Sequence, residues 1–387
     1  MREFSSREVD LFLCDAERHG ACLDSFPGHL HRLLETRVRA GELISPLPRL
    51  YARLSLWAGL SPAQRALFVL RGLRMLHPTW VFCGVSAALA YGLSVSYHLL
   101  DTIQVASTSG MRPLHAGHAQ SMRVDPEELS APYEVSGLAV TSPARTVFDC
   151  ARRLPFREGV AVADSALRLG AVTPEELRTY VTEKRGGYHG IARARAVAAF
   201  ADARSESGGE SLARATMYEL GFMVPDLQYV IEDPLDPQRH LRVDFRWELP
   251  DGTEILGELD GTEKYVNPAM NGGSPLEALL AERRRESHLS LRQSRLVRFS
   301  PADVADREHF EQLLVACGVP KDHEPLIEVT HAGGTGIRAG ARRRLRRVSR
   351  ATAHAKLAGP FWQLEPQNRA HNCQNRPASE PENSSTR

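Results

Sequence analysis

The segment that most constrains the fold covers residues 243–265, VDFRWELPDGTEILGELDGTEKY. Its residues 250–252, Pro-Asp-Gly, are typical of a tight turn, and both flanking runs alternate between apolar and polar residues. In a strand this alternation places Val243, Phe245 and Trp247 on one face. The segment therefore predicts an antiparallel hairpin that carries several carboxylates among packed residues.

Two registers are compatible with this turn. A two-residue loop at 251–252 would place Asp244 opposite Leu259, so Asp244 and Glu258 would point to opposite faces of the hairpin. A three-residue loop at 250–252, with its glycine in the left-handed conformation, would oppose Asp244 to Glu258. We predict the second register, because only this register lets the two acids share one site.

A helix before the hairpin is predicted to supply a third acid. The segment SESGGESLARATMYELGF has a helical apolar stripe and places Glu210 in the first turn. Carboxylates from one helix and two adjacent strands, with a lysine nearby, suit a magnesium- or manganese-dependent phosphodiesterase. The candidate catalytic residues are Glu210, Asp244, Glu258 and Lys264. The candidate metal ligands are Asp244, Glu258 and Asp260.

Each carboxylate also has a structural interpretation. Glutamate in a first turn is favoured by the helix dipole, which alone would explain Glu210. Asp260 and the glycine after it could simply form a turn. Glu258 lies in an apolar run and needs a partner if buried, which a metal or an ion pair could provide. The arginines considered for that ion pair are Arg246, Arg284 and Arg285.

The length and composition fit two or three globular domains. The chain has 387 residues, 42% of them hydrophobic and 25% charged. Lys and Arg number 48 against 47 Asp and Glu, so a nucleic-acid surface would require local clustering of cations. The expected regions are a DNA-binding module at 1–75, a middle domain at 76–203, an α/β domain at 204–320 and a disordered arginine-rich tail at 330–387.

The first region has the order of elements of a winged helix-turn-helix. Ser5 followed by Glu8 forms a capping-box pattern that starts one helix, and GHLHRLLETRVRAG predicts a second helix with a basic outer face. The sequence ELISPLPRLYAR suits a two-stranded wing. The predicted contacts with duplex DNA are His31, Arg32 and Arg37. The alternative is that this basic face is ordinary solvated surface.

In the second region, VTSPARTVFDCARRL predicts a helix with Ser142 at the N-cap and Pro143 at its first position. Arg145 and Asp149 are four residues apart on that helix. This spacing favours an intrahelical ion pair over a catalytic role.

The remaining features concern compartment and partners. The six cysteines include no C-x-x-C pair, which argues against a disulfide framework and a structural zinc. The N-terminus lacks the pattern of a signal peptide, and no apolar run is long enough to span a membrane. A cytoplasmic protein is therefore expected.

Several motifs carry a family resemblance over about residues 5–303. The patterns ES-x-x-R, VDF-x-W and GE-x-DG-x-x-KY resemble the restriction-endonuclease-like domain related to very-short-patch-repair (Vsr) nucleases, of the PD-(D/E)xK superfamily. The TSPART-x-x-D helix at 141–149 and the winged-helix order resemble AbiEi-type antitoxins. The superfamily's usual lysine stands two residues after the acid. Here that position is Asp260, and the nearest lysine is Lys264.

Together these patterns predict an α/β protein with an N-terminal winged helix-turn-helix, an AbiEi-like α+β middle domain, a restriction-endonuclease-like domain with a central mixed sheet, and a disordered basic tail. Two functions follow from the resemblance. One is a DNA-binding protein with a magnesium-dependent nuclease-type domain. The other is an antitoxin-like transcriptional regulator that has a cognate toxin and uses the endonuclease-like domain as a non-catalytic scaffold.

Overall fold

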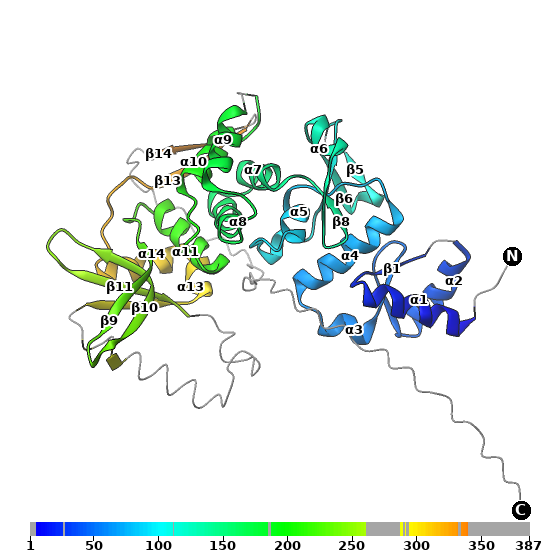
Figure 1. Cartoon of the computed structure of the whole chain (residues 1–387), viewed down its shortest axis with the longest axis horizontal. Helices are drawn as coiled ribbons and strands as arrows, with labels where there is room; N and C mark the ends of the chain where they lie inside the picture. Colours follow the sequence, from blue (N-terminus) through cyan, green and yellow to red (C-terminus); the bar gives the residue numbers. More distant parts are fainter. Residues whose placement is uncertain are drawn as a thin grey trace, which may run out of the picture. The chain divides into compact units, whose positions relative to one another are not determined.

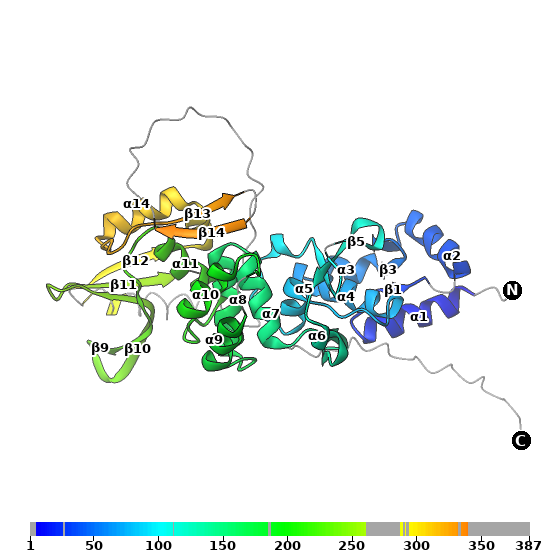
Figure 2. The same cartoon turned by 90° about the horizontal axis from the view of Figure 1, so that it is seen from above.

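The computed structural model describes residues 5–25, 28–110, 112–184, 187–260, 287–288, 291, 294–331 and 334–339. The chain divides into two compact units, with the boundary between Thr79 and Trp80. Their helices and strands are labelled in Figure 1 and Figure 2. Among the described helices, none combines the length and the apolar character needed to cross a membrane.

The first unit contains four helices and a small antiparallel sheet in its described part. The strand order is β1-β3-β2. In chain order the elements are α1 (Ser6–Arg18), β1 (Leu23–Asp24), α2 (Gly28–Arg39), β2 (Leu43–Leu47), β3 (Leu50–Arg53), α3 (Leu54–Gly59) and α4 (Pro62–Leu76).

Local signals account for these elements. The predicted capping box is confirmed, since the hydroxyl of Ser5 accepts from the backbone of Glu8 while the carboxylate of Glu8 accepts from the backbone of Ser5. The predicted second helix and the following strand pair are also present as α2, β2 and β3. The buried core between them consists of Val9, Leu13, Leu30, Leu34, Leu43 and Tyr51.

The second unit begins with small sheets and then a group of helices. Strands β4, β6 and β5 form one sheet, and β7 pairs with β8. The helices α7, α8, α9 and α10 pack around a common apolar core. The elements are α5 (Gly84–Ala90), η1 (Tyr97–Leu99), β4 (Ile103–Ser107), β5 (Pro113–Leu114), η2 (His115–Gly117), β6 (Ala119–Arg123), α6 (Pro126–Ser130), β7 (Tyr133–Val135), β8 (Leu138–Val140), α7 (Pro143–Arg153), α8 (Phe156–Arg168), α9 (Pro174–Glu183) and α10 (Ile191–Phe200).

The rest of the second unit is built on a mixed four-stranded sheet in the order β12-β11-β10-β9. Helix α11 packs against α8 and so joins this sheet to the preceding helices. Figure 2 shows α11 between the sheet and that helical group. The elements are α11 (Gly208–Glu219), β9 (Asp226–Asp233), β10 (Asp236–Glu248), β11 (Glu254–Leu259), β12 (Arg295–Phe299), α13 (Pro301–Ala305), α14 (Arg307–Cys317), β13 (Leu326–His331) and β14 (Gly334–Ala339).

The hairpin of β10 and β11 has the predicted register. Phe245 pairs with Gly257, and the ladder runs to Glu248 opposite Glu254. The N–H of Leu249 donates to the carbonyl of Thr253 at 2.9 Å, which closes a loop of three residues. Gly252 in that loop has φ +82°, the left-handed conformation that glycine adopts without strain.

The faces of β10 differ from the expected alternation. Phe245 and Trp247 pack into the core beneath α11, as predicted. Val243 was expected to join them, but it packs in a separate cluster with Leu256. In the neighbouring strand β9, Gln228 has a positive φ of 53° beside this point.

The prediction of a disordered tail from residue 330 places its start too early. Strand β13 pairs with β14 in an antiparallel hairpin, from Leu326 opposite Ala339 to His331 opposite Gly334. Residues 340–387 lie outside the described part of the chain.

Candidate functional site

Glu210 lies in the first turn of α11 and is 7% exposed. Oε1 accepts from the hydroxyl of Ser207 at 2.8 Å, while Oε2 accepts from the backbone of Glu206 and the side-chain amide of Gln228. Burial, and then the negative charge of Asp244, raise the pKa of Glu210 to about 7 in spite of these hydrogen bonds. Asp244 thus lies close enough to Glu210 for its charge to act on that carboxyl.

Asp244 faces the neighbouring strand β11. Its Oδ2 accepts from the backbone N–H of Leu259 at 2.9 Å. The paired ladder between β10 and β11 stops one residue away, at Phe245 and Gly257. The carboxylate of Asp244 therefore accepts a hydrogen bond from a backbone N–H of β11 that the ladder leaves unpaired. Asp244 thus has a structural role in addition to its effect on Glu210.

Glu258 forms an ion pair, which is one of the two roles expected for it. It is 3% exposed, and its Oε2 accepts from Arg298 at 2.7 Å. Arg298 stands directly beside Glu258 in the parallel pairing of β11 with β12, and it also lies 4.0 Å from the carboxylate of Asp260. This partner differs from the expected arginines. Arg246 instead donates to Glu254 at 2.9 Å, whereas 284 and 285 lie outside the described residues.

The acidic residues do not fit a divalent cation in this arrangement. Across the described residues, no group of three or more His, Cys, Asp or Glu side chains is placed to hold a metal ion. A pKa of about 7 leaves Glu210 partly protonated near neutral pH, and the protonated carboxyl is a poor ligand for magnesium. Glu258 is engaged by Arg298. Lys264, the predicted catalytic lysine, lies outside the described residues.

The three predicted DNA contacts on α2 have different environments. Arg32 is exposed. His31 is half-buried, and its Nδ1 lies 2.7 Å from the hydroxyl of Tyr51 on β3. Arg37 lies 2.9 Å from Asp10 on α1 and donates to Glu42 at 2.7 Å. Arg37 therefore joins α2 to its neighbours, while Arg32 remains available at the surface.

Sequence reasoning did not single out two other exposed cations of the first unit as DNA contacts. Arg39 ends α2 and is exposed. Arg49 is exposed in the turn between β2 and β3, where it has a positive φ of 69°. Its position in the predicted wing was a usable signal, since a wing commonly contacts the phosphate backbone.

The predicted intrahelical ion pair on α7 is confirmed and belongs to a larger network. Nε of Arg145 donates to Asp149 at 2.7 Å, and both side chains are fully buried. Arg152 donates to the other oxygen of Asp149. Arg145 also reaches Asp125, which in turn accepts from Lys184 at 2.7 Å. The network joins α7 to the end of β6 and to α9.

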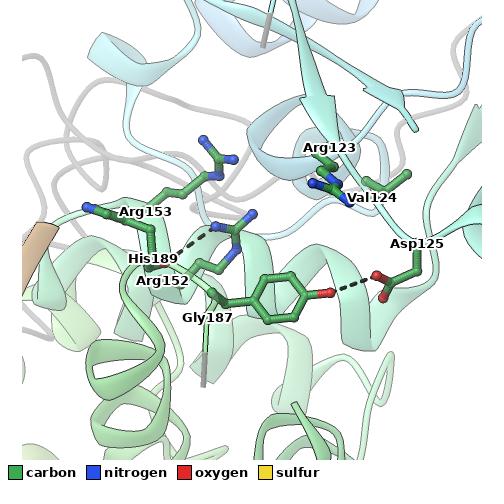
Figure 3. Close-up of a pocket in the computed structure, with 8 residues that line it drawn as sticks. Arg123, Val124, Asp125, Arg152, Arg153, Gly187 and His189 are labelled. Atoms are coloured by element: carbon green, nitrogen blue, oxygen red, sulfur yellow. Dashed lines mark hydrogen bonds between the residues drawn. The ribbon is translucent and has the colours of Figure 1, made fainter. Parts of the chain in front are cut away.

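A basic pocket of about 430 Å³ opens beside this network. Figure 3 shows Arg123 and Asp125 on one side of it, and Arg152 and Arg153 on another. The lining comes from the end of β6, the last turn of α7 and the loop before α10. The lining residues are Arg123, Val124, Asp125, Arg152, Arg153, Gly187, Tyr188 and His189. Sequence reasoning missed this site, although the Arg-Arg pair at the end of α7 was visible.

Comparison with known proteins identifies part of the chain. Residues 80–198 match the family described as "AbiEi antitoxin C-terminal domain". The predicted resemblance of the middle region to AbiEi-type antitoxins is therefore confirmed. The match covers less than a third of the 387 residues and includes the whole lining of the basic pocket.

Two curated relatives are uncharacterized proteins of Mycobacterium tuberculosis, from strain CDC 1551 / Oshkosh and from strain H37Rv. Each is 34% identical over 194 residues, which is 49% of this chain and 65% of the relative. The chain thus covers less than two thirds of the length of these relatives. No solved structure matches it. The chain is similar to AbiEi antitoxins over one domain and to these two proteins over about half its length.

Proposed function

We propose that this protein is a DNA-binding regulator of the antitoxin type, which binds duplex DNA through its first unit. The observation that carries the proposal is the match of residues 80–198 to a domain that is described as the C-terminal domain of an antitoxin. In this chain the matched domain follows a small unit that has helices, a hairpin and exposed arginines. Such a unit suits DNA recognition, and the protein would then act in the cytoplasm.

The order of elements in the first unit supports a winged helix-turn-helix. Helix α1 is followed by β1, helix α2 and the hairpin of β2 and β3, and β1 joins the hairpin in one sheet. In that class of domain the second helix of the motif enters the major groove, and the hairpin contacts the sugar-phosphate backbone. Helix α2 would then be the recognition helix.

The exposed cations support the same orientation. Arg32 and Arg39 lie on α2, and Arg49 lies at the tip of the hairpin. Exposed arginines bind phosphate oxygens with little loss of existing contacts. Arg37 is held by two carboxylates, so we assign it to the fold of the unit rather than to the DNA.

The experiment is a salt titration of the full chain with a fluorescent duplex. Affinity should fall steeply between about 50 and about 200 mM salt, because bound phosphates release counterions. Arg32→Gln combined with Arg49→Gln should reduce the slope of log K against log salt by about 2. Arg178→Gln removes an exposed arginine of α9 and is the matched control. Binding that is independent of salt, or equal in all three proteins, would contradict the proposal.

A toxin partner is the second part of this proposal, since the matched domain takes its name from an antitoxin. The sheet formed by β9 to β12 would then act as a scaffold. Co-purification with a protein that arrests growth when expressed alone, and relief of that arrest by this chain, would test the partnership. Continued arrest in the presence of the folded chain would count against it.

Metal-dependent phosphodiester hydrolysis, as in the endonuclease-like resemblance, is a second candidate function. It is favoured by one observation, the placement of Glu210 beside Asp244 at the predicted hairpin register. We derive no catalytic step, because the described residues do not fit the ion. A cleavage assay with magnesium and manganese on DNA and RNA, run beside Asp244→Ala and Glu258→Ala, tests it. Cleavage that both substitutions abolish would favour it, and absence of cleavage would remove it.

A further inference from the structure

The lining of the basic pocket carries more positive than negative charge. Its lining holds three guanidinium groups, those of Arg123, Arg152 and Arg153, and one carboxylate, that of Asp125. The carboxylate is already occupied, since it accepts from Lys184 and from the hydroxyl of Tyr188, each at 2.7 Å. These bonds outweigh the effect of burial and hold the pKa of Asp125 below its ordinary value. The pocket therefore remains basic.

Arg153 has a buried donor that the described part of the fold does not satisfy. Its Nε is buried and has no hydrogen-bond partner among the described residues. Burial, and then the positive charge of Arg152, lower the pKa of the Arg153 guanidinium. A buried donor without an acceptor destabilises a fold. An anion in the pocket would offset the repulsion between the guanidiniums of Arg152 and Arg153.

Of the two other arginines, Arg152 is held in place and Arg123 is exposed. Arg152 is 4% exposed and is fixed by two bonds to Asp149. Arg123 ends β6 and is exposed. The carbonyls of residues 152 and 154 lie at the negative end of α7, and both accept from Arg193. Because these oxygens are already hydrogen-bonded, they repel an anion in the pocket less than unpaired oxygens would.

We propose that this pocket binds the phosphate group of a small phosphorylated molecule. Three guanidiniums from a strand end and a helix end converge on one cavity, and this arrangement suits a compact oxyanion with several acceptor oxygens. A nucleic-acid backbone would instead require cations spread along a line. The cavity of about 430 Å³ has room for the molecule to which the phosphate is attached. This proposal does not depend on DNA binding by the first unit.

The test is calorimetric titration of the full chain with inorganic phosphate and pyrophosphate, against chloride at equal ionic strength. Arg153→Gln and Arg123→Gln should each weaken pyrophosphate binding about tenfold or more, the loss expected for one charged hydrogen bond. Arg178→Gln on α9 removes one exposed cation from outside the lining and should leave the affinity unchanged. A single-stranded oligonucleotide without a terminal phosphate is the competing probe.

Phosphate and pyrophosphate binding that is weakened in both pocket variants and unchanged in the control supports the proposal. The absence of binding, an equal effect of chloride, or unchanged affinity in Arg153→Gln overturns it. Oligonucleotide binding that depends on Arg153 and takes the place of phosphate binding also overturns it. Circular dichroism reports whether each variant folds. If Arg153→Gln does not fold, the exposed Arg123→Gln decides the outcome.

Discussion

Arg145 donates to Asp149 at 2.7 Å, and neither side chain is accessible to solvent. Asp149 is shared with Arg152, so one carboxylate balances two guanidiniums inside the fold. Replacing Asp149 by Asn would leave the buried Arg152 without its carboxylate and Arg145 with that of Asp125 alone. We expect a loss of about 3–5 kcal/mol in the free energy of unfolding, measured by urea denaturation.

The control for this variant is Glu206→Gln. It removes the charge of an ion pair with Arg242 in which both side chains are about half exposed. An exposed pair contributes about 1 kcal/mol or less. A loss of similar size in the two variants would show that the buried network does not stabilise this unit more than a surface pair does.

Much of the local structure was predictable because its causes are local. The capping box depends on Ser5 and Glu8, three residues apart, and the ion pair of Arg145 depends on a residue one helical turn away. The hairpin register follows from the loop and from the glycine at 252. In each case the residues that decide the geometry are contained within one short segment.

The rest depends on contacts between distant segments. Glu258 pairs with Arg298 because β11 and β12 lie side by side in parallel, forty residues apart in the chain. The sequence around Glu258 gives no information on that register. The basic pocket likewise requires the end of β6, the end of α7 and the loop before α10 to meet. The arginines were visible in the sequence, whereas their convergence was not.

Stability should depend on pH through Glu210. Its pKa is raised from 4.5 to about 7 in the folded protein, so the folded state binds the proton more tightly than the unfolded chain does. This contribution to stability is fully present below about pH 4.5 and is lost as the pH rises through about 7. The raised pKa corresponds to about 3 kcal/mol. Glu210→Gln should remove this part of the pH dependence in urea unfolding between pH 5 and pH 8.

Two further variants test whether the charge of Asp244 contributes to the raised pKa of Glu210. Asp244→Asn removes the neighbouring negative charge and should move the transition to lower pH, because that charge raises the pKa of Glu210. Glu175→Gln changes an exposed carboxyl of α9 and should leave the profile unchanged. A profile that Asp244→Asn does not alter would mean that the two carboxylates are not coupled.

Replacing Arg37 should lower stability, whereas replacing Arg32 should weaken DNA binding. Arg37→Gln breaks contacts with Asp10 and Glu42, so it should lower the stability of the first unit by about 1–3 kcal/mol. Arg32→Gln should leave that stability nearly unchanged and weaken DNA binding instead. Urea denaturation and duplex titration of both variants separate the two roles. The reverse pattern would show that Arg37 is the DNA contact.

Gly190, in the loop directly before α10, should be sensitive to an added side-chain atom. Gly190 has φ +79°, and a Cβ there would lie 1.9 Å from the carbonyl oxygen of Arg152, a backbone atom at the pocket. Gly252 in the hairpin turn has a similar φ of +82° with no atom within 4 Å of its Cβ position. Gly252→Ala should therefore cost only the backbone strain, about 1–2 kcal/mol. Gly190→Ala should cost about 3 kcal/mol or more in urea denaturation, because overlap adds to the same strain. Equal losses would show that this loop is not held against the end of α7, and the pocket would then lack a fixed wall.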